Sequence, residues 1–173
     1  MEEALRARKF VFELHFKNMM DAITTFSRKK FNEDQRLSIG YVESTLHALM
    51  DYWERLKEIP NATFSKELKE IMRAFHFANN KLKHHVAVDY LTPVKVLHGH
   101  RFPMRFPINF SLTYAWTNLD SAARPSVKAD MEALQDYRNN LEGRDIRYTF
   151  AHLKSLLEKE VALILHLQEG THV

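Results

Sequence analysis

The chain of 173 residues has no cysteine, only four glycines and five prolines, and no long apolar run. Without cysteine there is no disulfide framework, no thiol nucleophile and no thiolate metal site. So few glycines and prolines favour helices over a loop-rich β fold. No apolar run approaches the roughly 18 residues needed to span a bilayer, and no N-terminal stretch has the apolar core of a signal peptide. We therefore expect a cytoplasmic protein with no membrane contact.

The amino-acid composition is typical of a folded globular protein. Apolar residues make up 45% of the chain and charged residues 27%, scattered evenly, as in globular domains. The length is that of one domain with a sizeable core, so a single domain over residues 1–173 is expected. The net charge of +3 is weaker than a nucleic-acid coat needs. Any contact with RNA would therefore be local.

Apolar residues at three- and four-residue spacing predict helices over most of the chain. The predicted segments are about residues 2–31, 32–59, 65–85, 126–143 and 145–170. Ser65 and Asp145 are expected N-caps, while Pro60 and Gly143 are expected to end the helices before them.

One segment has a different period. From 102 to 113, apolar and polar residues alternate strictly, which predicts a strand with one buried face. Residues 94–97 are its expected partner, with a turn at 98–100. Pro103 and Pro107 cannot donate to a ladder, so an edge or loosely paired strand is expected. The predicted fold is mainly α: a four- to five-helix bundle with a small β-hairpin insertion, at about 94–113, between the third helix and the last two.

Candidate functional residues gather at the end of the third predicted helix. At about 100° per residue, Arg73, Asn80 and His84 fall within roughly 40° of one another, beside the apolar stripe. The flanking positions are Lys69, His76 and Lys83. An imidazole suits proton transfer near neutral pH, and an amide with cations can hold a phosphate. The structural alternative is that basic and amide residues are common at helix C-termini.

The segment Asn79-Asn80-x-x-x-His84, at the end of a bundle helix and before a β insertion, resembles the HEPN superfamily. That family consists of small α-helical bundles, many of them metal-independent ribonucleases of toxin–antitoxin, abortive-infection and CRISPR systems. Its motif is an arginine, four to six residues and a histidine, often with a polar residue directly after the arginine. On this alignment Asn80 matches the polar position and His84 the histidine. Asn79 stands where the family has its phosphate-binding arginine.

The absent arginine leaves three interpretations open. The chain is a HEPN-like fold without nuclease activity, or Lys83 or Arg73 supplies the positive charge. In the third interpretation the motif lies on the last predicted helix, where Arg147 and His152 also have the Arg-x4-His spacing.

The resemblance implies a protein of a bacterial or phage defence or toxin-type system that acts on RNA as a metal-independent endoribonuclease, or a catalytically degenerate relative. In that case His84 would move the proton at the RNA 2′-hydroxyl or at the leaving 5′-oxygen. Lys83 or Arg73 would stabilise the charge on the phosphate, and Asn80 would orient it. A homodimer, RNA and a protein partner such as an antitoxin are the implied partners. The alternative is a non-catalytic helical module that binds a protein partner.

The ten histidines raise the question of a metal site. The closest groups are His84-His85 and His98-Gly99-His100, with Asp89 as a further ligand. Adjacent histidines on a helix point about 100° apart and do not easily serve one ion. No glycine-rich phosphate loop is present. We therefore predict no metal and no cofactor.

Overall fold

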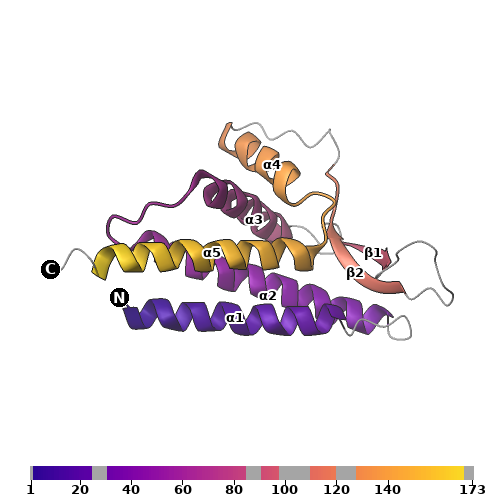
Figure 1. The fold of residues 1–173 in the computed structure, drawn as a ribbon. Helices are drawn as coiled ribbons and strands as arrows, with labels where there is room; N and C mark the ends of the chain where they lie inside the picture. The colour runs from indigo at the N-terminus through magenta and orange to yellow at the C-terminus, as the bar shows by residue number, and fades with distance from the viewer. Residues whose placement is uncertain (1, 25–30, 85–90, 98–109, 120–127, 170–173) are drawn as a thin grey trace, which may run out of the picture.

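The computed structural model describes residues 2–24, 31–84, 91–97, 110–119 and 128–169 (Figure 1). Its helices are α1 (Glu2–Thr24), α2 (Phe31–Lys57), α3 (Lys66–His84), α4 (Lys128–Asn140) and α5 (Ile146–Glu169). The strands β1 (Leu91–Leu97) and β2 (Phe110–Trp116) come between α3 and α4. The prediction of a mainly α bundle with a β insertion at this place is confirmed. None of the described helices combines the length and apolarity that crossing a bilayer requires.

The two strands pair antiparallel, and the predicted partner segment 94–97 pairs with 110–113, the end of the predicted strand. Leu91 pairs with Trp116 and Leu97 with Phe110, so the sheet begins at 91 and ends at 116. The predicted turn at 98–100 lies outside the described residues. The connecting residues 98–109, including most of the predicted strand, lie outside the described residues. Tyr114 and Trp116 are fully buried, so the sheet is anchored to the helices at the end that the alternation did not include.

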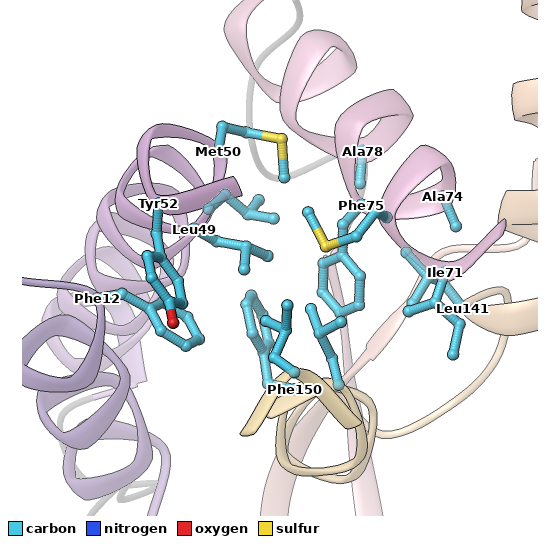
Figure 2. Packing of buried hydrophobic residues seen from close by; sticks show 14 of the residues in the cluster. Phe12, Leu49, Met50, Tyr52, Ile71, Ala74, Phe75, Ala78, Leu141 and Phe150 are labelled. Atoms are coloured by element: carbon cyan, nitrogen blue, oxygen red, sulfur yellow. The ribbon is translucent and has the colours of Figure 1, made fainter. Parts of the chain in front are cut away.

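The core is centred on aromatic side chains from three elements. Phe75 of α3 lies 4.8 Å from Phe150 of α5 and 5.7 Å from Trp116 of β2, measured between ring centroids. The Trp116 indole Nε1 donates a 2.9 Å hydrogen bond to the Thr149 hydroxyl. Figure 2 shows Phe75 and Phe150 facing Leu49 of α2. Trp116 is thus one of the buried side chains that join the strand pair to the bundle, and its polar atom is satisfied.

Both N-caps named above are confirmed. The Ser65 hydroxyl oxygen accepts a 3.1 Å hydrogen bond from the Leu68 amide, and Asp145 Oδ1 accepts one of 2.8 Å from the Arg147 amide. Ser65 is held in turn by the buried carboxylate of Glu160 on α5. That carboxylate accepts from the Ser65 amide at 2.9 Å and from its hydroxyl. The start of α3 is therefore fixed against α5.

α4 ends at Asn140, three residues before Gly143, which was predicted to end it. The φ of Gly143, 71°, lies in the left-handed region, where glycine is favoured. Its amide donates to the Trp116 carbonyl, and the Trp116 amide donates to the Arg144 carbonyl. The connection from α4 to α5 is thereby attached to the end of β2.

Candidate functional site

A groove of about 480 Å³ lies between α2, α3 and α4. The α3 side chains that line it are Lys69, Met72, Arg73, His76, Phe77 and Asn80. α2 adds Trp53, Glu54 and Lys57, and α4 adds Asp130 and Ala133. Lys69, Arg73, His76 and Asn80, hereafter the polar stripe, are spaced by four, three and four residues. This spacing puts them on one face of a helix.

His76 and Asn80 contact each other within the polar stripe. The Asn80 amide nitrogen lies 3.3 Å from His76 Nδ1. When the amide nitrogen donates, the neutral ring carries its proton on Nε2. Turning the amide by half a turn presents its oxygen and supports a proton on Nδ1. Asn80 can thus hold the His76 ring in either state while Nε2 is left to a ligand.

Arg73 is held by an acid from another helix. Its Nε donates a 2.6 Å hydrogen bond to Asp136 Oδ2 on α4. This hydrogen bond raises the pKa of Arg73 above its ordinary value. The Asp136 side chain is 10% exposed and the Arg73 side chain 49% exposed. The bond engages Nε and not the terminal Nη groups, so Arg73 is positioned at the groove with part of its guanidinium facing outward.

The other charges of the groove nearly balance. Lys57 forms an ion pair of 2.7 Å with Glu54, one helical turn away. Asp130 lies in the first turn of α4. Lys69 has no acidic partner among the described residues. The groove therefore offers Lys69 and Arg73 to a single anionic group and has no broad positive surface.

The structure brings together two of the four residues predicted to be catalytic. Arg73 and Asn80 line the groove, whereas Lys83 and His84 belong to the last turn of α3 and their side chains lie outside the described part. His84 follows Asn80 by four residues and so occupies the next turn of the same helix. Asn79 is 3% exposed and does not line the groove. An arginine at position 79 would have to be buried, so this position does not present a cation to the groove.

The alternative motif on α5 does not form one site. Arg147 is paired with Asp145 through Nη2 at 2.9 Å and Nε at 3.3 Å. Burial raises the pKa of Asp145, but the hydrogen bonds from Arg147 outweigh it, and the net shift is downward. His152 lies instead 3.6 Å from Glu67, with its ring parallel to that of Tyr148. It lines a separate pocket of about 160 Å³ that Arg147 does not reach.

His76 was predicted from the sequence only as a position flanking the candidate residues, whereas in the structure it lies within the groove. The signal was the spacing itself, three residues after Arg73 and four before Asn80. No sequence pattern indicated Asp136 or Trp53, because they come from other helices.

Metal ligands do not gather in the described part of the chain. Within it, no group of three or more His, Asp or Glu side chains lies close enough to hold an ion. The sequence-level candidates His84, His85, His98, His100 and Asp89 have side chains outside that part.

A lysine, a guanidinium, an imidazole and an amide on one helix face can bind a phosphate group and move a proton beside it. No protein-family model, no curated protein and no solved structure matches the chain.

Proposed function

We propose that the chain is a HEPN-like protein that cleaves RNA in the groove between α2, α3 and α4, without a metal ion. The polar stripe carries this proposal, since it places two cations and an imidazole held by an amide in one open groove. Cleavage of a phosphodiester requires charge stabilisation and proton transfer, which are the two things these groups supply. The resemblance of Asn80 and His84 to the HEPN motif, on the same helix, supports the same assignment.

In the proposed reaction Lys69 and the Nη groups of Arg73 bind the nonbridging oxygens of the scissile phosphate. The 2′-oxygen of the RNA attacks phosphorus, and its proton passes to Nε2 of His76, which can accept it when the Asn80 amide oxygen faces Nδ1 and the neutral ring carries its proton there. The bond from phosphorus to the 5′-oxygen breaks, and that oxygen takes a proton from water or from His84. The products are a 2′,3′-cyclic phosphate and a 5′-hydroxyl. Asn80 keeps the His76 ring in place through both protonation states.

The test is cleavage of a labelled single-stranded RNA by the purified protein in excess EDTA. General acid–base catalysis contributes about 10²- to 10⁴-fold, so His76→Ala should slow cleavage by at least about 100-fold. His152→Ala is the matched control, because this exposed histidine lies outside the groove, and it should cleave like wild type. If RNA cleavage is lost in His84→Ala but not in His76→Ala, the group that moves the proton is His84, at the end of α3. A wild-type protein that cleaves no RNA would refute the proposal.

A second function, binding of a protein partner, is favoured by the surface of α1. Phe10 and Leu14, one turn apart, are 65% and 45% exposed, and Val11 lies beside them. Large apolar side chains exposed side by side often mark an interface. The expected partner is a second copy of the chain, as in HEPN proteins. Light scattering should then report a dimer for wild type and a monomer for Leu14→Glu; a monomeric wild type would contradict this assignment.

A further inference from the structure

One wall of the groove is aromatic, and its residues take no part in the proposed cleavage reaction. Trp53 of α2 and Phe77 of α3 line it beside the polar stripe. The Trp53 ring packs on the ring of Phe64, with their centroids 4.7 Å apart and a tilt of 51°, and Phe64 does not line the groove. Trp53 is only partly buried, whereas Trp116, the other tryptophan of the chain, is 1% exposed. A partly exposed indole next to cations is the arrangement that proteins use to stack the bases of single-stranded nucleic acids.

The size and charge of the groove fit one nucleotide and not a longer polyanion. Its volume of about 480 Å³ lies within the roughly 300–1,000 Å³ of small-molecule sites. Lys57 is neutralised by Glu54, which leaves Lys69 and the outer part of Arg73 for one phosphate. A duplex would bring many phosphates and no free base face, because its bases are stacked on one another. A single strand brings an unstacked base beside each phosphate.

We infer that Trp53 stacks on the base of a nucleotide whose phosphate is bound by Lys69 and Arg73, and that the site therefore selects single-stranded over double-stranded RNA. This inference rests on the proposed function and deepens it by naming the substrate class. It assigns Trp53 a role in binding, not in proton transfer. Because stacking depends little on base identity, the site discriminates by strandedness more than by sequence.

The first test is quenching of tryptophan fluorescence by a short 2′-O-methyl RNA, which binds but cannot be cleaved because its 2′-oxygen has no proton to lose. Wild type should show saturable quenching. Trp53→Phe, in which Trp116 is the remaining tryptophan, should show none while it retains most of the affinity. Trp53→Ala should bind the oligonucleotide about 10-fold more weakly, within the range that loss of one base stack produces. A duplex of the same length should bind more weakly than the single strand to wild type.

The outcomes separate this inference from the proposed function. Cleavage by wild type with no quenching, and with unchanged affinity in Trp53→Ala, would overturn the stacking role and leave the proposed reaction standing. Quenching that disappears in Trp53→Phe, in a protein that cleaves no RNA, would support the base site and overturn the reaction. Equal binding of duplex and single strand would overturn the selectivity. If Trp53→Ala fails to fold, as thermal unfolding would reveal, the comparison of wild type with Trp53→Phe still decides.

Discussion

Replacing Arg73 with alanine tests whether this guanidinium, which lines the groove, also holds α3 to α4. The ion pair with Asp136 is short, 2.6 Å, and joins a half-exposed side chain to one that is 10% exposed. Removing Arg73 leaves the largely buried Asp136 carboxylate without its cation. The free-energy cost of desolvating this carboxylate is then no longer offset by the ion pair.

The magnitude follows from the burial of the two partners. Exposed ion pairs contribute about 0.2–1 kcal/mol, and breaking a fully buried pair costs about 3–5 kcal/mol. Since Arg73 is half exposed, we expect Arg73→Ala to lower the free energy of unfolding by about 1–2 kcal/mol. At about 2–4 °C per kcal/mol for a chain of this size, the melting temperature should fall by about 2–8 °C.

Urea denaturation of wild type, Arg73→Ala, Asp136→Ala and the double variant measures this energy directly. The double variant should be more stable than the sum of the single losses predicts, with a coupling energy of about 1 kcal/mol. RNA cleavage should fall in Arg73→Ala. It should fall less in Asp136→Asn, which keeps the Arg73 guanidinium but weakens the interaction that holds it in place. Strict additivity, with a coupling below about 0.3 kcal/mol, would refute the view that the pair positions Arg73.

Three further predictions concern charge and pH. Burial, with Glu13 and Glu158 nearby, raises the pKa of Tyr52 to about 12; the neutral phenol is therefore favoured by folding. The contribution of this phenol to the free energy of unfolding should be fully present below about pH 10, and that free energy should fall by about 2 kcal/mol as the pH rises to 12. In urea denaturation, Tyr52→Phe should not show this decrease. The pKa of Asp145 is lowered, so its contribution is present above about pH 4 and lost as pH falls through its folded pKa. Asp145→Asn should accordingly flatten the acid side of the stability profile, and a profile as steep as that of wild type would contradict this. Asp130→Asn removes a negative charge from the groove and should raise RNA affinity about twofold in an anisotropy titration, whereas a cationic partner would bind this variant more weakly.

The helices and their ends were predictable because their signals are local. Ser65 and Asp145 are capping residues at positions where the side chain reaches an amide two or three residues ahead. Gly143 adopts a backbone conformation that few other residues accept. The pairing of 94–97 with the following strand was predictable, but its extension to Leu91 and Trp116 was not, since that depends on the burial of Trp116 against Phe75 and Phe150, residues far away in the chain.

The candidate site likewise consists of residues with a local sequence signal and residues that are brought in by packing between helices. The polar stripe follows from helical periodicity, which the sequence carries explicitly, and Arg73 and Asn80 were identified in this way. Asp136 and Trp53, which give the stripe its ion pair and its aromatic wall, come from α4 and α2. Their approach to α3 depends on how three helices pack, and no short pattern in the sequence encodes that.

The strand pair has a practical consequence. β1 belongs to the N-terminal part of the chain together with α1, α2 and α3, and β2 to the C-terminal part together with α4 and α5. A protein cut between 98 and 109 would yield two halves that share one sheet, one aromatic core and the groove, whose walls come from both. Trp53 and the polar stripe would stay on the N-terminal half, and Asp136 on the C-terminal half would meet them only on reassembly. Each half would therefore carry only part of the groove until the two strands pair again.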